Sequence, residues 1–517
     1  MHFCNRRRLH PDPSLQMNGV AIPVVKETKY LGIIFDNKLS FIPHLKNLHT
    51  KCLKALNLIR VLTAKDWGSD SQTLLKLYRC LIRSKLDYGS IIYGSARRSY
   101  LQMLDPIQNQ ALRTCLGAFR TSPVESLQAE ANEAPLSLRR KTLALQYAVK
   151  ILSNPRNPTY DSIYNLKSEQ LFIRKPNAIP PLGIRIQQYL NTIQIDTSSV
   201  AEFNFPSVPP WLLHMPNVIL KLHTEQLKKS NTNPEIFKQL FYEFITSFLD
   251  HIQLYADGSK EGSKVGCAML SGSTLFQCRL PDSCSIFTAE LRAILLALDF
   301  ISGSHHDKFL ILSDSLSSLQ SVKNCNVDEP LTRQILEKCH NLHGMGKTIS
   351  FCWVPSHVGI KGNEKADMAA RAALSLPVVN FKIPYTDIKT KIKAHFVKLW
   401  QEHWNGVVFN KLKPIKPALG LTKFPNINRR RDETVLHRLR IGHSYLTHSF
   451  LLKQNDHPEC TTCSCALMVE HILLHCPAFT PSRLKYFNVS SLFELFNSVS
   501  APNIVNFLKE IHLYSEI

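Results

Sequence analysis

The sequence predicts an α/β protein whose centre is a mixed five-stranded sheet covered by helices. Two observations lead to this fold class. Three strand-like runs follow one another closely at 252–256, 265–270 and 274–280, which is typical of an antiparallel meander. After them, helical and strand-like runs alternate as far as residue 376. We therefore expect one α/β domain over residues 250–376, with helical regions before and after it.

Four acidic residues of the expected domain lie where strands end or helices begin. Asp257 and Asp314 each follow an apolar strand-like run, and Glu290 and Asp367 lie near the starts of helical runs. Clustered carboxylates repel one another, and burying that repulsion is costly unless divalent cations neutralise it. A set of this kind therefore indicates Mg²⁺ or Mn²⁺, and two such ions suit phosphodiester hydrolysis.

The motifs around these residues resemble those of type 1 ribonuclease H. Tyr255–Ser259 is similar to that family's first-strand motif, and Thr288–Ala293 is similar to its first-helix motif. Ser313–Ser315 resembles the end of the family's fourth strand, and Trp353–Asp367 resembles its last strand, mobile histidine loop and final helix. The resemblance implies a ribonuclease H-like sheet and an endonuclease that hydrolyses the RNA strand of RNA:DNA hybrids.

The resemblance also implies a role for each acidic residue. Asp257, Glu290, Asp314 and Asp367 would together hold two Mg²⁺ or Mn²⁺ ions about 4 Å apart, with Asp257 bridging both. One ion would activate a water molecule and the other would stabilise the leaving 3′ oxygen, giving a 5′-phosphate and a 3′-hydroxyl. His357 has the position of the mobile histidine, which would help protons move or product leave, whereas a lone loop histidine usually has no role.

Recognition of a hybrid of any sequence has to come from 2′-hydroxyl contacts and groove shape. The candidate substrate-binding residues are Gly258, Ser259 and Asn363. The side chains of Lys260, Lys264 and Arg292 fit phosphate contacts and a solvated surface equally well.

The composition favours a polyanionic partner. The 517 residues carry 62 Lys and Arg against 40 Asp and Glu, a net charge of +22. Such an excess favours nucleic acid first and an anionic membrane surface second, so we expect RNA:DNA hybrid, RNA and DNA as partners. No signal peptide and no apolar stretch of ~20 residues is apparent. We therefore expect an intracellular protein, nuclear or cytoplasmic, with no membrane partner; no feature specifies an oligomeric state.

The flanking regions resemble the polyproteins of non-LTR retrotransposons. Within residues 1–150, which show amphipathic helical patterns, Tyr30–Ile33 and Leu86–Gly89 resemble the region after the polymerase palm of their reverse transcriptases. Residues 151–249 are proline-rich, which predicts a linker. Arg438–His443 resembles the tail of the same polyproteins.

One departure from that family concerns the polymerase. The family needs two adjacent aspartates on a palm hairpin, and no two aspartates are adjacent in this sequence. We therefore expect residues 1–150 to be a helical remnant of the reverse transcriptase region, without polymerase activity. The alternative to a nuclease is a catalytically silent nucleic-acid-binding remnant, but the four intact carboxylates favour the nuclease.

Residues 380–517 are expected to form a basic, α-rich region with a zinc site. The four candidate ligands are Cys460, Cys463, His471 and Cys476. Two thiolates separated by two residues can bind one Zn²⁺ ion from a tight turn, and a histidine and a cysteine at helical spacing would complete a closed, structural tetrahedron. The alternative is a set of buried cysteines without a metal. His475 is an alternative fourth ligand, and Cys465 is a further thiol.

Two other features of this region allow a functional and a structural interpretation. The arginines at 429–431, 438 and 440 fit either nucleic-acid binding or a solvated basic helix face. Trp400 and Trp404, one helical turn apart, are expected in the core and not as a platform for stacking bases.

Overall fold

The computed structural model of the protein describes residues 1–517 except 4–10, 65–66, 167–171, 173–179, 203–207, 223–231, 421–426 and 428. The chain divides into two compact units by its internal contacts. The first unit comprises Met1–Ala144, Lys167–Ile186 and Ala394–Ile517, and the second comprises Leu145–Leu166 and Gln187–Lys393. No helix within the described ranges is both long and apolar enough to cross a membrane.

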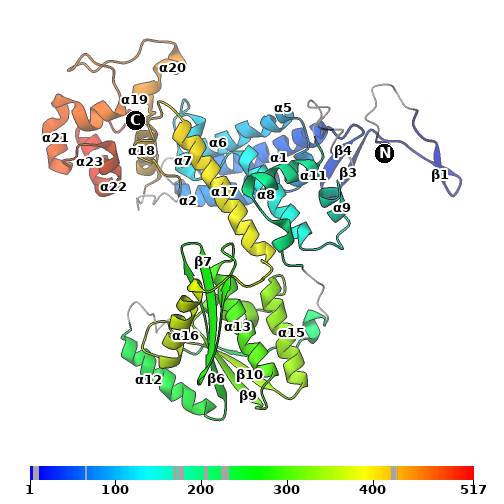
Figure 1. Ribbon diagram of the computed structural model, residues 1–517. Coiled ribbons are helices and arrows are strands. Elements are labelled where there is room, and N and C mark those ends of the chain that lie inside the picture. Colours follow the sequence, from blue (N-terminus) through cyan, green and yellow to red (C-terminus); the bar gives the residue numbers. More distant parts are fainter. Residues whose placement is uncertain are drawn as a thin grey trace. The chain divides into compact units, whose positions relative to one another are not determined.

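The second unit is built on a mixed six-stranded sheet (Figure 1). The strands lie in the order β5 (Asn217–Ile219), β10 (Thr348–Trp353), β9 (Lys308–Ser313), β6 (Ile252–Glu261), β7 (Lys264–Ser271) and β8 (Thr274–Leu280). β6, β7 and β8 form an antiparallel meander, whereas β5, β10, β9 and β6 pair in parallel. The predicted mixed α/β sheet is confirmed, with one strand more than the five predicted.

The additional strand, β5, lies in the proline-rich stretch for which the sequence predicts a linker. It pairs with β10 over only three residues, from Asn217 opposite Ser350 to Ile219 opposite Cys352. So short a strand has too few positions to show the alternation or the apolar run that reveals a strand in a sequence. Parts of the predicted linker, including 203–207 and 223–231, lie outside the described residues.

β6 is longer than the predicted run 252–256. Residues 252–255 pair in parallel with β9, and the antiparallel pairing with β7 continues as far as Glu261. Asp257 lies opposite Ala268 of β7. It is therefore inside β6 and not at its end, because β7 still pairs with β6 after the pairing with β9 has stopped.

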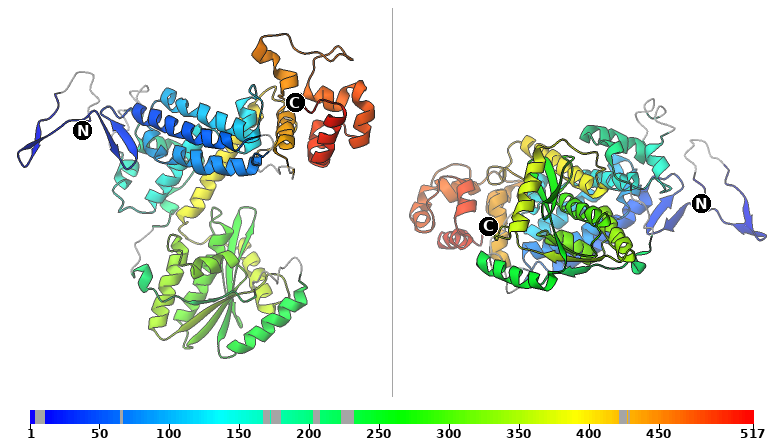
Figure 2. Two further views of the ribbon diagram at one scale, coloured as in Figure 1. Left: turned by 180° about the vertical axis from the view of Figure 1, so that it is seen from behind. Right: turned by 60° about the horizontal axis from the view of Figure 1, so that its bottom comes forward.

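Helices pack on both faces of this sheet, α13 (Ile286–Ser302) and α15 (Pro330–Gly344) on one face and α16 (Lys361–Ala372) on the other (Figure 1). The view from behind in Figure 2 shows the same layers. α13 begins after Ser285, whose side chain accepts a hydrogen bond of 3.1 Å from the backbone N–H of Thr288 and so caps the helix.

Two glycines allow these helices to approach β6 closely. A Cβ atom at Gly258 would lie 2.8 Å from the backbone nitrogen of Glu290 in α13. A Cβ atom at Gly362 of α16 would overlap the ring of Tyr255. A larger residue at either position would push a helix away from β6. The two glycines thus set how near the functional residues of the helices come to Asp257.

The first unit is mainly helical, as the amphipathic patterns predict. Its larger core packs together α1 (Ile42–Val61), α2 (Ser71–Tyr78), α6 (Asp105–Leu116) and α7 (Val124–Ala131). A second core packs α18 (Arg430–Ile441) with α22 (Leu492–Ser498) and α23 (Ala501–Glu510). Trp400 and Trp404 are 7% and 1% exposed, so the prediction that they belong to the core is confirmed.

A tight hairpin lies near the start of the first unit. It joins β3 (Glu27–Tyr30) to β4 (Ile33–Asp36). The two residues between them, Leu31 and Gly32, have φ of 46° and 84°. Positive φ at both positions is what a type I′ two-residue hairpin loop requires, so the motif Tyr30–Ile33 contains the turn of a hairpin.

Two buried ion pairs involve α18 of the first unit. Glu130 of α7 is fully buried, and it accepts a hydrogen bond of 2.7 Å from Arg440 and lies 3.0 Å from Nδ1 of His437. Arg430 is 6% exposed and forms an ion pair of 3.0 Å with Glu433. A buried carboxylate requires such partners. The expectation of a solvated basic helix face is therefore wrong for Arg430 and Arg440.

Candidate active site

Three carboxylates of the second unit converge. Asp257 lies on β6, Glu290 lies near the start of α13, and Asp314 directly follows β9. One carboxylate oxygen of each lies within 4.8 Å of the others. Asp257 and Glu290 are only 4% and 7% exposed. The structure thus brings together three of the four acidic residues that the sequence identifies.

The fourth acidic residue, Asp367 of α16, lies beside this group. Its Oδ1 accepts a hydrogen bond of 3.0 Å from Nε of Arg371, and its Oδ2 lies 3.7 Å from Nδ1 of His357. The side chain of His357 is 60% exposed, and its φ of 54° turns the loop between β10 and α16. His357 therefore presents an imidazole to solvent next to the carboxylates.

The carboxylates change one another's protonation. Burial, and then the negative charges of Asp314 and Asp367, raise the pKa of Asp257 to about 8. Burial and the charges of Asp257 and Asp314 hold the pKa of Glu290 well above its ordinary value. Burial also raises the pKa of Asp314, although the hydrogen bond from Asn363 opposes this. Without a cation, the group therefore retains a proton near neutral pH.

The donor set fits a divalent cation. Mg²⁺ and Mn²⁺ prefer carboxylate oxygens. Oε2 of Glu290 is buried and has no hydrogen-bond partner within the described part of the chain. A buried polar atom without a partner is costly, and a cation held by Asp257, Glu290 and Asp314 would satisfy it.

Neighbouring side chains hold Asp314 and the histidine loop in place. Asn363, which is 2% exposed, donates from Nδ2 to Oδ2 of Asp314 at 3.4 Å. Nε1 of Trp353 donates to the backbone carbonyl of Asp314 at 2.9 Å. Glu364 accepts a hydrogen bond of 2.8 Å from the backbone N–H of Gly359 in the loop. Asn363, a candidate substrate contact from the sequence, is thus buried against a carboxylate.

The other candidate contacts lie on or near β6. Gly258 and Ser259 are partly exposed and pair with β7. Lys260 donates from Nζ to the backbone carbonyl of Cys284 at 2.8 Å, and Arg292 forms an ion pair of 3.8 Å within α13. The side chains of Lys260 and Arg292 therefore already have polar partners within the second unit.

Sequence reasoning did not identify Arg371 and Trp353 as site residues. The spacing of four between Asp367 and Arg371 on a helix is a signal for their ion pair. No comparable signal exists for Trp353. Its contact with Asp314 arises only because Trp353 pairs with Ser313 across neighbouring parallel strands.

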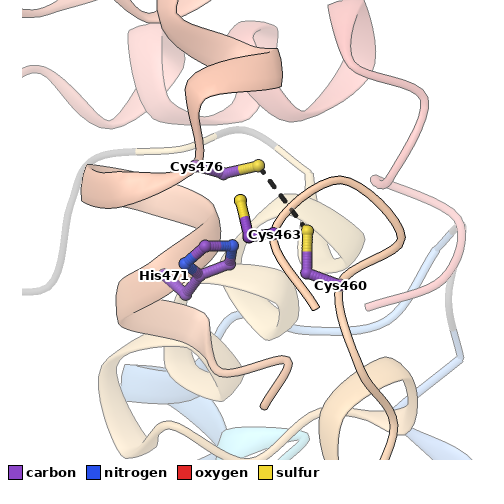
Figure 3. Close-up of side chains that lie close together, drawn as sticks. All are labelled: Cys460, Cys463, His471 and Cys476. Carbon is purple, nitrogen blue, oxygen red and sulfur yellow. Dashed lines mark hydrogen bonds between the residues drawn. The ribbon is translucent and has the colours of Figure 1, made fainter. Parts of the chain in front are cut away.

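A second cluster lies in the first unit (Figure 3). Its ligand atoms come from Cys460, Cys463, His471 and Cys476 and all lie within 4.8 Å of one another. The sulfur atoms of Cys460 and Cys476 are 3.8 Å apart, and all four side chains point toward one another (Figure 3). A closed set of three thiols and one imidazole fits a structural Zn²⁺ ion.

Local backbone geometry builds this cluster. The N–H of Ser464 donates to the carbonyl of Cys460 at 2.8 Å, which closes the turn that carries Cys460 and Cys463. His471–His475 is a single π-helical turn, closed by a bond of 2.8 Å from the N–H of Cys476 to the carbonyl of His471. A π turn places residues five apart on one side. This explains how His471 and Cys476 meet, which regular α-helical spacing would not achieve.

The two other potential ligands lie outside the cluster of four. Nε2 of His475 is 3.9 Å from Oε1 of Glu470, and the side chain of His475 is 58% exposed. Cys465 is exposed, with its sulfur 3.6 Å from Nδ1 of His471. The geometry therefore favours Cys476 over His475 as the fourth ligand.

Comparisons with known proteins agree with this arrangement. Residues 250–375 match the RNase H family. The Retrovirus-related Pol polyprotein from type-1 retrotransposable element R1 of Bradysia coprophila is 30% identical over 128 residues, which is 24% of this chain and 13% of that protein. The RNA-directed DNA polymerase from mobile element jockey of Drosophila funebris is 24% identical over 145 residues, 28% of this chain and 16% of that protein. The Putative 115 kDa protein in type-1 retrotransposable element R1DM of Drosophila melanogaster is 30% identical over 141 residues, 27% of this chain and 14% of that protein.

The matched regions thus span only a small part of these relatives. Residues 250–375 form an RNase H domain, and the chain is similar to polyproteins of non-LTR retrotransposons, as the motifs predict.

Proposed function

We propose that the second unit is a metal-dependent endonuclease that hydrolyses the RNA strand of RNA:DNA hybrids. The carboxylate group of Asp257, Glu290 and Asp314 inside an RNase H domain carries this proposal. Its largely buried, mutually repelling carboxylates are chemically suited to bind divalent cations.

In this proposal Asp257, Glu290 and Asp314 hold Mg²⁺ or Mn²⁺, and Asp367 is the further carboxylate of a site for two ions. When bound, the ions supply an activated water for in-line attack and neutralise charge on the scissile phosphate. Asp314 is positioned by its hydrogen bonds from Asn363 and Trp353. Nδ1 of His357, near Asp367, can take up or release a proton at the open side of the site.

The substrate in this proposal is a hybrid of RNA and DNA. The protein's net charge of +22 attracts this polyanion. The 517 residues contain no two adjacent aspartates, so we propose hydrolysis without DNA synthesis. The cluster of Cys460, Cys463, His471 and Cys476 would hold a structural Zn²⁺ ion.

A second candidate is a catalytically silent remnant that binds nucleic acid. The ion pair between Arg371 and Asp367 favours it, because it occupies one carboxylate of the site. The side chain of Arg371 is 60% exposed, however, and such pairs stabilise a protein by only about 0.2–1 kcal/mol. A cation could therefore displace Arg371 at little cost.

Incubation of the full chain with a labelled hybrid, in Mg²⁺ and in EDTA, distinguishes the two candidates. The matched variants are Asp314→Asn, inside the carboxylate group, and Glu261→Gln, which is exposed at the end of β6. The nuclease proposal expects cleavage in Mg²⁺ by the wild type and by Glu261→Gln but not by Asp314→Asn. Binding of the hybrid by all three proteins without cleavage would support the silent remnant instead.

A further inference from the structure

A basic cavity of about 300 Å³ lies in the first unit, outside both clusters described above. Four arginines line it: Arg113 of α6 and Arg430, Arg431 and Arg438 of α18. Thr63 and Thr434 add hydroxyl groups, and none of the described residues that line the cavity is acidic.

The positive charge of this cavity is only partly compensated by groups of the first unit. Arg113 donates from Nη2 to the carbonyl of Ser122 at 3.4 Å, but its buried Nε has no hydrogen-bond partner within the described ranges. Arg438 donates to the backbone carbonyl of Gly117 at 2.9 Å and to an oxygen of Ile517, the last residue of the sequence, at 2.7 Å. Arg431 donates to the backbone carbonyls of Tyr514 at 3.4 Å and Ser515 at 3.2 Å. Of the four arginines, Arg430 is the one already described in an ion pair, with Glu433.

The pKa values of the arginines reflect this imbalance. Burial, and then the charge of Arg120, lower the pKa of Arg113. Burial, and then the charges of Arg431 and Arg430, lower the pKa of Arg438 to about 10. Burial is the larger cause of both pKa shifts, and the neighbouring positive charges add to it. An anion in the cavity would relieve this repulsion.

The backbone keeps the two helices of the cavity close together. Gly117 ends α6 with φ of 63°, and a Cβ atom there would overlap the side chain of Thr434 on α18. Any other residue at position 117 would both strain the backbone and push α18 away. The convergence of the arginines therefore depends on a specific local geometry and does not result from mobile surface side chains.

We infer that this cavity binds a phosphate group. Planar guanidinium forks bind the oxygens of a phosphate in pairs, and several of them around one anion form strong charge-assisted hydrogen bonds. Free inorganic phosphate and the phosphate of a nucleic acid share this chemistry. The site is independent of the proposed nuclease, because none of its residues belongs to the second unit.

Isothermal titration calorimetry on the full chain tests the inference. The probes are inorganic phosphate, acetate at the same ionic strength, and one short DNA oligonucleotide with and without a 5′-phosphate. The test variants are Arg113→Gln and Arg431→Gln. The control is Arg98→Gln, which removes the same charge from an exposed position on α5 (Arg98–Leu101) of the same unit. Circular dichroism verifies the fold of each variant.

We expect inorganic phosphate to bind the wild type and Arg98→Gln alike, and to bind each test variant about tenfold more weakly or not at all. Asp314→Asn should bind phosphate like the wild type, which separates this result from the nuclease test. A 5′-phosphate that strengthens oligonucleotide binding in the wild type but not in the test variants would identify nucleic acid as the source. Equal binding of acetate, or phosphate binding unchanged in both test variants, would overturn the inference.

Discussion

Replacing Asp257 by Asn is expected to stabilise the metal-free second unit near neutral pH. The environment of Asp257 raises its pKa from the ordinary 3.8 to about 8. Between these two values the folded protein binds a proton that the unfolded chain has released. The free energy of unfolding is therefore highest below about pH 4, and it decreases as the pH rises toward 8. Asn carries no charge to bury, so the variant should lack this loss.

The size of the effect follows from proton linkage. One extra proton in the folded state lowers the free energy of unfolding by about 1.4 kcal/mol for each pH unit. Between about pH 5.5 and about pH 7.5 the wild type in EDTA should thus lose about 3 kcal/mol relative to Asp257→Asn. The charge of Asp257 also raises the pKa of Glu290, so its removal should flatten the remaining pH dependence as well.

Hydrogen exchange, detected by mass spectrometry, measures this loss of stability in the second unit alone. Peptides from β6 and α13 report the free energy with which that unit opens. Exchange is compared at both pH values in EDTA for the wild type, Asp257→Asn and the exposed control Glu261→Gln. Saturating Mg²⁺ should then protect the wild type and the control more than the variant, since a cation that binds the folded state stabilises it by mass action. An equal pH dependence for the wild type and Asp257→Asn would show that Asp257 does not retain an extra proton in the folded state.

Three further predictions concern other parts of the molecule. Elemental analysis of the purified wild type should find zinc, which Cys476→Ser should lose and His475→Ala should retain; the opposite pattern would make His475 the ligand. Arg371→Gln should reduce the Mg²⁺ concentration for half-maximal cleavage by up to about fivefold, because an exposed ion pair that competes for Asp367 stabilises the protein by at most about 1 kcal/mol; an unchanged Mg²⁺ titration would show that the pair does not compete. Glu130→Gln should destabilise the first unit by about 3–5 kcal/mol, because it leaves buried Arg440 and His437 without their carboxylate. Urea unfolding, followed by hydrogen exchange of peptides from α18, measures this change. A decrease in unfolding free energy below about 1 kcal/mol would contradict the prediction.

The sequence was most informative where function is encoded in local structure. The runs that lead into Asp314 and Glu290 form β9 and α13 at nearly the predicted positions, because apolar periodicity and the Ser285 cap determine them locally. The pattern of Cys460, Cys463, His471 and Cys476 likewise identifies four side chains that converge in space. These features depend on neighbours in the chain, which a sequence displays directly.

Features that depend on distant residues were not predictable. The extension of β6 past Asp257 depends on the pairing with β7 beyond the edge of β9, which no local pattern specifies. Arg440 looks like a surface cation until α18 packs against α7 and places it beside Glu130. At His471–His475 the helix is a π turn, in which the N–H of Cys476 donates to the carbonyl five residues earlier instead of four. No pattern in the sequence indicates this hydrogen bond.

Cleavage of an RNA:DNA hybrid, followed separately on each strand, tests whether the second unit is a ribonuclease. The two strands carry different labels, and the ends of the products are mapped after incubation of the full chain with Mg²⁺. We expect the RNA strand to be cut into fragments with 5′-phosphate and 3′-hydroxyl ends while the DNA strand stays intact, and we expect EDTA or Asp314→Asn to abolish the cutting. An uncut RNA strand, in a sample whose β6 and α13 are protected from hydrogen exchange, would contradict this expectation.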